Sequence, residues 1–326
     1  MTASYLTRLV HTRLFGIGVA ALALAGACFF FFSGLCEPLT GDKGLGLPSA
    51  NEWLPTPLAE FGGAMGASAV TVLTMLLLNK VYNVLRSMSS LYIALFAAMQ
   101  LATPALFTQF YTGSALAIVV PVCIFFLFSC YREPASTRHI FVIFLLLSFF
   151  TATQYCYAGY MIVFLAGLGQ MRIFNARSLV AAALGIITPW WIMFGFGIVS
   201  PDSVRMPSFV SIFSEIDYEE TFMLLVTLGV TAFIMVLCFV LNFLKTIAYN
   251  ARARAVNGVF TVLALVTMAM MCADYRNIIA YVPMLNFCAA MEATHYFSTH
   301  RAEKSFIAIL IILAVYAAIF VCQTII

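Results

Sequence analysis

Two carboxylates near the N-terminus, Glu37 and Asp42, have the position that acid–base chemistry at a membrane surface requires. Glu37 directly follows an apolar run near residues 14–35, and Asp42 lies five residues further on. A carboxylate at a partly desolvated interface can be tuned to accept a proton from a sugar or alcohol hydroxyl. We therefore predict that Glu37 or Asp42 is a general base. The alternative is that both are solvated acids of a loop.

Three basic residues, Lys43, Arg205 and Arg276, belong to the same predicted side of the membrane as these carboxylates. Arginine binds phosphate through two parallel N–H groups, so these side chains are candidates for holding the phosphate of a lipid-linked substrate. Asp274 is close enough in sequence to pair with Arg276 instead. Both interpretations stay open at this point.

A further polar pair, Glu292 and His295, lies inside the apolar run 278–297. A spacing of three residues puts the two side chains on one face of a helix. Ionisable residues inside a membrane span are functional candidates. The pair is also close to one end of the span, where a local hydrogen bond or an extended side chain would satisfy it. A single Glu-x-x-His is too little for a di-iron site.

Trp190 and Trp191 follow Pro189 in the middle of the apolar run 179–199. A proline inside a helix removes a backbone hydrogen bond and kinks the helix. We predict that the two tryptophans line a groove at the kink, with simple packing as the alternative.

The segment 200–220 combines an amphipathic stretch with acidic residues. Its apolar residues are spaced i, i+3, i+4 and i+7 after Pro207 and Ser208, which predicts a short helix lying in the membrane interface. Acids follow this stretch and oppose the helix dipole, so a divalent cation is a possible cofactor, and a solvated loop is the alternative. The apolar residues are Phe209, Ile212, Phe213 and Ile216, and the acids are Glu215, Asp217, Glu219 and Glu220.

Several chemistries find no support in the sequence. It contains no HExxH, GxSxG or phosphate-binding Gly-Lys loop, which argues against soluble-type nucleotide hydrolysis. The nine cysteines form no CxxC pair and are interpreted as packing residues, so the presence of a metal site stays unknown. Nothing points to nucleic acid as a partner, and the oligomeric state is open.

Composition identifies the elements that must position these residues. The chain is 63% hydrophobic and 9% charged, whereas soluble domains carry about 25% charged residues. We therefore predict an all-α, polytopic membrane protein that forms a single transmembrane domain over residues 1–326, without a separate soluble domain. Eleven spans are expected near 14–35, 61–78, 91–107, 114–130, two within 139–169, 179–199, 221–244, 259–273, 278–297 and 306–326.

The basic residues predict sidedness. A basic turn between Arg172 and Arg177 separates two apolar runs, and short loops rich in Lys and Arg stay in the cytoplasm. With eleven spans and a cytoplasmic N-terminus, the C-terminus is external and thirteen of the sixteen Lys and Arg residues are cytoplasmic. Whether both helices within 139–169 cross fully stays open, because 31 residues are few for two crossings. The thirteen residues are Arg8, Arg13, Lys80, Arg86, Arg132, Arg138, Arg172, Arg177, Lys245, Arg252, Arg254, Arg301 and Lys304.

Residues 10 to 200 resemble the GT-C superfamily of polytopic glycosyltransferases in their pattern. The likeness lies in an acid after the first span (Glu37), a Pro-Leu at the second (Pro57) and a basic turn before Leu184-Gly185 and Pro189-Trp190. The resemblance implies a polyprenyl-phosphate-linked sugar as substrate, Glu37 or Asp42 as base, and Arg205 or Arg276 as phosphate contact. The first outer loop is shorter than is usual in that superfamily.

The turn Arg-x-Phe-x-x-Arg, from Arg172 to Arg177, is also similar to a set of uncharacterised bacterial inner-membrane proteins, which implies no activity. We thus expect a multi-pass protein of the bacterial inner membrane in contact with lipids. Whether it is an enzyme is undecided. One hypothesis is a lipid-linked sugar transferase acting at the outer face. The other is a non-catalytic scaffold or transporter component that uses Glu292 and His295 or a tryptophan-lined groove.

Overall fold

The computed structural model describes residues 12–35, 47–85, 88–133, 135–200, 204, 218–247, 249–299 and 304–325. In these residues the chain forms helices and no strands, as predicted. Eleven helices of 13 to 30 residues are described: α2 (Arg13–Phe32), α3 (Pro57–Tyr82), α4 (Ser89–Leu101), α6 (Thr112–Ser129), α7 (Thr137–Thr151), α8 (Cys156–Gln170), α9 (Ala176–Gly195), α10 (Tyr218–Ile247), α11 (Ala251–Ala273), α12 (Ile278–Thr299) and α13 (Lys304–Ile325).

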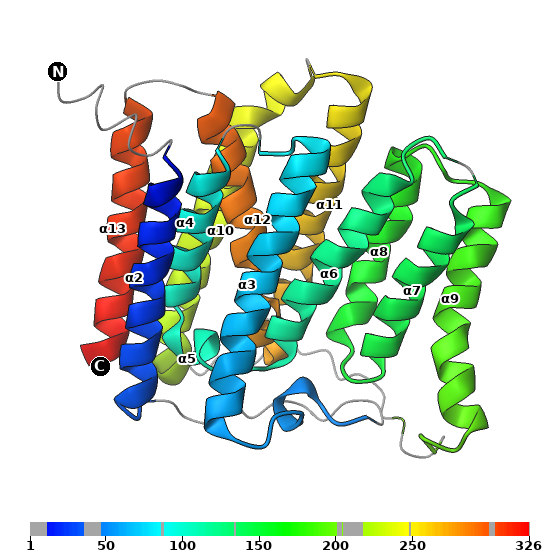
Figure 1. Cartoon of the computed structure of the whole chain (residues 1–326), viewed down its shortest axis with the longest axis horizontal. Coiled ribbons are helices and arrows are strands. Elements are labelled where there is room, and N and C mark those ends of the chain that lie inside the picture. The colour runs from blue at the N-terminus through cyan, green and yellow to red at the C-terminus, as the bar shows by residue number, and fades with distance from the viewer. Residues whose placement is uncertain are drawn as a thin grey trace.

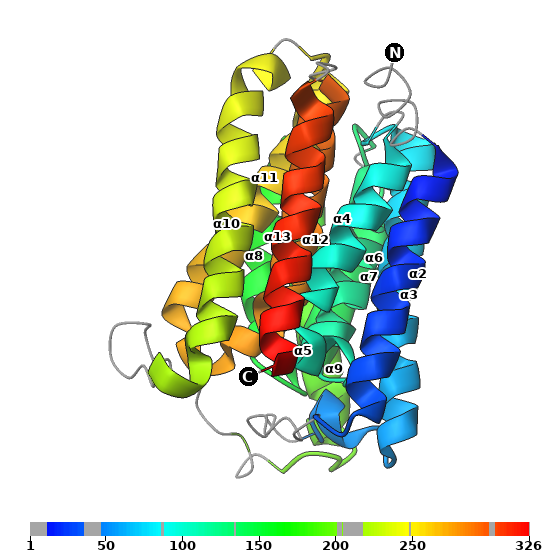
Figure 2. The same ribbon diagram turned by 90° about the vertical axis from the view of Figure 1, so that its left-hand side faces the viewer.

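Successive long helices run in opposite directions across one bundle (Figure 1). We call the end at which α2 and α13 begin the upper end, and the end at which α3 and α12 begin the lower end. The connections that carry the predicted cytoplasmic arginines lie at the upper end. Helix α13 finishes at the lower end, as Figure 2 also shows.

Seven of the described helices are long and apolar enough to cross a membrane: α2, α3, α6, α9, α10, α11 and α13. They expose large apolar side chains such as Phe196, Trp191 and Ile325. Water does not stabilise such surfaces, whereas lipid chains do. The molecule is therefore a helical membrane protein with several spans.

Three helices are shorter than a full crossing. Helix α4 has 13 residues, and α7 and α8 have 15 each. At a rise of about 1.5 Å per residue they extend about 20–23 Å, less than the ~30 Å of a hydrocarbon core. The segment 139–169 does form two helices with a turn at 152–155, as expected, and a count of eleven crossings stays a prediction.

Helix α12 lies at the centre of the bundle. It packs against α4, α6, α10 and α11, and nearly all of its residues are buried. The amide of Asn286 donates to Gln100 Oε1 on α4 over 2.7 Å, so one of its polar groups is satisfied inside the bundle. This helix carries Glu292 and His295 into the protein interior.

Close approaches of backbones hold the outer helices. Helix α9 packs along α7, where a Cβ on Gly185 would lie 2.6 Å from the Phe141 carbonyl oxygen. The Ser148 hydroxyl donates to the Ile186 carbonyl over 2.7 Å at the same crossing. Small residues at a helix crossing are typical of membrane proteins, because they let dispersion and polar contacts replace the hydrophobic effect.

Two expected element bounds were wrong. The span predicted at 91–107 is two pieces, since α4 ends at Leu101 and a short helix α5 (Pro104–Phe107) follows. Pro104 explains the break, because a proline disfavours helical geometry in the residue before it. Helix α10 begins at Tyr218, so Glu219 and Glu220 belong to a helix rather than to a loop. The predicted interfacial helix, including Glu215 and Asp217, lies outside the described residues.

Candidate functional site

A mainly apolar cavity of about 270 Å³, with a few polar side chains in its lining, lies at the upper end of the bundle, where α10 and α11 meet α12. Helix α12 packs closely against both of its neighbours, whereas α10 and α11 contact each other little, so the cavity lies between those two helices. We call it the Glu292 cavity. Its polar lining includes Gln170, Asn242, Arg254, Asn257, Glu292 and His295.

Glu292 is 6% exposed and lines this cavity. Among the described residues, no side chain or backbone group forms a hydrogen bond or ion pair with its carboxylate. Moving a carboxylate out of water is expensive unless a donor or an opposite charge replaces the lost hydration. Glu292 therefore leaves an acceptor in the cavity that is suited to a bound donor.

His295 is held in one orientation by α10. Asn242 Nδ2 lies 2.5 Å from His295 Nδ1, and the Thr299 hydroxyl lies 3.3 Å from Asn242 Oδ1. An amide nitrogen donates, so this contact uses His295 Nδ1 as its acceptor and ties α12 to α10. Ser298 and Thr299 both donate to the His295 carbonyl, which fixes the end of α12.

Gln170, the last residue of α8, reaches the cavity because Gly258 leaves room on α11. A Cβ on Gly258 would lie 3.0 Å from Gln170 Oε1. This oxygen is buried and accepts no hydrogen bond from the described residues. Because Gln170 Oε1 has essentially no accessible surface, the Glu292 carboxylate is the unpaired acceptor open to the cavity.

A second cavity of about 280 Å³ shares Asn257 and His295 with the first. Its lining includes Arg252, whose guanidinium lies 5.4 Å from the centre of the Tyr82 ring. Asn250 caps α11 by accepting from the Ala253 amide over 2.9 Å. The N-terminus of a helix carries partial positive charge, which adds to the guanidinium at the entrance.

Arg254 of the Glu292 cavity lies on the same first turns of α11 and is exposed. The upper rim of the Glu292 cavity is therefore positively charged, and the carboxylate of Glu292 lies below this rim.

The lower end contains a satisfied polar cluster around Asp274. This carboxylate is 3% exposed and accepts from the Tyr281 hydroxyl over 2.9 Å and from Asn277 Nδ2 over 3.0 and 3.1 Å. Gln154 Nε2 donates to Asn277 Oδ1 over 3.3 Å, which ties the turn between α7 and α8 to the turn η3 (Tyr275–Asn277). Arg276 is exposed on this turn.

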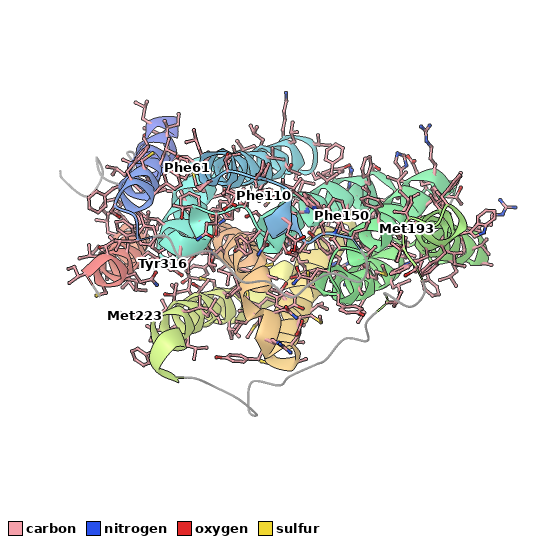
Figure 3. The ribbon with its side chains drawn as sticks, turned by 90° about the horizontal axis from the view of Figure 1, so that it is seen from below. Phe61, Phe110, Phe150, Met193, Met223 and Tyr316 are labelled. Atoms are coloured by element: carbon pink, nitrogen blue, oxygen red, sulfur yellow. The ribbon has the colours of Figure 1, made fainter. Side chains whose placement is uncertain are left out.

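The described part of the connection between α2 and α3, residues 47–56, is anchored to the same end. Trp53 lies 6.2 Å from the rings of both Phe110 and Phe150, and Figure 3 shows these two phenylalanines seen from below. Its indole N–H donates to the Pro48 carbonyl over 3.1 Å.

The other sequence-derived candidates have separate positions. Glu37, Asp42, Lys43 and Arg205 lie outside the described residues, and their proposed roles stay predictions.

The two tryptophans of α9 do not line the Glu292 cavity. Trp191 is 76% exposed on the side of the bundle. Trp190 stacks on Phe194 at 5.9 Å and packs against Met193 and its neighbours. A tryptophan-lined groove stays a prediction.

Sequence reasoning identified Glu292 and His295 but missed the other cavity residues. Asn242 carries a usable signal, because it is an amide near the end of the apolar run 221–244. Gln170 carries none, because its position depends on the contact between α8 and Gly258.

In the described part of the chain, no three His, Cys, Asp or Glu side chains come together. Glu292 and His295 thus lack the third protein ligand that zinc sites generally use. No protein family, curated protein or solved structure matches the chain.

Proposed function

We propose that the protein is a multi-pass membrane protein that binds a small polar solute in the Glu292 cavity, as a component of a transporter. The observation that supports this most directly is the Glu292 carboxylate, which is buried beside a mainly apolar cavity without a partner among the described residues. Intramembrane carboxylates generally face a pathway or a ligand, because facing neither is energetically unfavourable.

The upper end is the cytoplasmic side in this proposal. Arg252 and Arg254 lie on the first turns of α11, next to the short connection after α10, and the positive-inside rule assigns such basic ends of spans to the cytoplasm. The solute would then enter from the cytoplasm. The volume of about 270 Å³ is slightly below the usual range for small-molecule pockets, about 300–1,000 Å³, so the solute is small.

The test is a thermal-unfolding screen of the purified full-length protein in lipid nanodiscs. Separate pools of amino acids, amines, sugars and carboxylic acids are added to wild type, to Glu292→Gln and to Glu52→Gln. Glu52 is exposed in the turn η1 (Ala50–Glu52) at the opposite end, so its substitution is the matched control.

We expect one pool to raise the Tm of wild type and of the control, but not of Glu292→Gln. A ligand at 100 times its Kd stabilises by about 2.7 kcal/mol, which a Tm measurement detects. Any compound that binds is then tested for uptake into proteoliposomes. The proposal is wrong if no pool acts, or if the shift persists without the carboxylate.

A lipid-linked sugar transferase at the outer face is the second candidate. One observation favours it: Trp53 holds part of the first outer loop against the end of the bundle where Arg276 is exposed. Glu37 and Asp42 precede this anchored part of the connection between α2 and α3, and Arg276 is a basic residue suited to phosphate.

The transferase is tested with polyprenyl-phosphate-linked sugars and the variants Glu37→Gln, Asp42→Asn and Arg276→Gln. Loss of a general base typically lowers the rate by about 10²- to 10⁴-fold. Transfer that continues in both carboxylate variants would exclude Glu37 and Asp42 as bases.

A further inference from the structure

The Glu292 cavity presents opposite charges at two depths. Arg254 is exposed on the first turns of α11. Thr261 also lines the cavity and lies seven residues further along the same helix, so the lining on α11 extends about 10 Å along the helix axis. On α12, Glu292 lies three residues below His295, about 4.5 Å deeper. The positive group is thus at the rim and the carboxylate is inside.

The positive charge at the rim of the cavity and the carboxylate in its interior do not pair with each other. In the described residues, Arg254 and Glu292 form no ion pair, although both line the cavity. The partial positive charge at the N-terminus of α11 adds to Arg254 at the rim. A solute that reaches from the rim to the interior would place an anionic group beside Arg254 and a cationic group beside Glu292.

The interior of the cavity favours a positively charged donor. The Glu292 carboxylate receives no hydrogen bond from the described residues. An ammonium group has three N–H donors and a positive charge, so it can satisfy both oxygens of this carboxylate. A metal ion fits less well, because the described residues supply no third acidic, histidine or cysteine ligand.

From this arrangement we infer that the solute is a small zwitterion, with its ammonium group against Glu292 and its anionic group at Arg254. This inference rests on the proposed solute-binding function and narrows it to one chemical class. The separation of the charges favours an amino group and an anionic group at opposite ends of a short chain.

Calorimetric titration of the full-length protein in nanodiscs tests the charge pattern. The probes are the ω-amino acids from glycine to 6-aminohexanoate, with the n-alkylamine and the carboxylic acid of matching length for each. The proteins are wild type, Glu292→Gln, Arg254→Gln and Arg138→Gln. Arg138 is exposed on α7 and controls for loss of a surface arginine.

We expect at least one ω-amino acid to bind wild type and Arg138→Gln equally. Its amine and its carboxylic acid should bind about 10- to 100-fold more weakly, as should the amino acid to Glu292→Gln and Arg254→Gln. The inference is overturned if an amine binds as tightly as its amino acid, or if Arg254→Gln has no effect.

The experiments distinguish the proposal that the protein binds a solute from the inference that this solute is a zwitterion. If the sugar pool stabilises the protein through Glu292 while no ω-amino acid binds, the zwitterion is wrong and solute binding stands. If no compound of any class acts, both are wrong.

Discussion

Replacing Glu292 with glutamine should stabilise the ligand-free protein. The carboxylate is 6% exposed and receives no hydrogen bond from the described residues. A buried polar group without a partner costs about 1–3 kcal/mol, and more when it is charged. Glutamine has the same shape without the charge, so the free energy of unfolding should rise by about 1–3 kcal/mol. Nearly every other substitution of a central, buried residue should lower the free energy of unfolding.

The assay is thermal unfolding of dialysed protein in nanodiscs, for wild type, Glu292→Gln and Glu52→Gln. A gain of this size should raise the Tm by about 2–6 °C, while the exposed control should stay within about 1 °C. A fall in Tm for Glu292→Gln would refute the reasoning, because it would mean that the carboxylate has a stabilising partner.

Two further predictions concern packing and the lower polar cluster. Gly185→Ala should lower the free energy of unfolding by about 1–3 kcal/mol, because the new Cβ would lie 2.6 Å from the Phe141 carbonyl oxygen. Gly66→Ala on α3 is the control, since no atom lies within 4 Å of its new Cβ, and it should be neutral or stabilising. Equal losses of stability in the two variants would refute the close approach at Gly185. Tyr281→Phe should cost about 1–3 kcal/mol by removing a donor from buried Asp274, while Tyr275→Phe removes a buried hydroxyl without a partner among the described residues and should cost less. Chemical denaturation in detergent measures both pairs, and a larger loss for Tyr275→Phe would contradict the hydrogen-bond assignment.

The positions of the helices were predictable because lipid demands long apolar runs. Each predicted span overlaps a described helix, and the span predicted at 91–107 is divided between α4 and α5, since helices satisfy their own backbone in hydrocarbon. The depth that each helix reaches was not predictable. Helices α7 and α8 are apolar but short, and composition alone cannot say whether neighbours or lipid cover their ends.

The candidate site was predictable only in part. Glu292 and His295 are conspicuous, because charge inside an apolar run is costly. Their neighbours come from other helices, and Arg254 lies seven residues before Thr261 in a helix whose rotation is set by packing. The contact of Gln170 with Gly258 depends on how closely two backbones approach, which a sequence pattern does not encode.

The central position of α12 has a consequence for how the protein is made. This helix is absent from the set that is apolar enough to enter lipid alone. Its polar partners, Gln100 on α4 and Asn242 on α10, precede it in the chain and are synthesised first. The membrane insertion of α12 should therefore depend on helices already in place. Deletion of α10 together with α11, which keeps the direction in which α12 must cross, should leave α12 outside the bilayer in an insertion assay, even though the residues of α12 are unchanged.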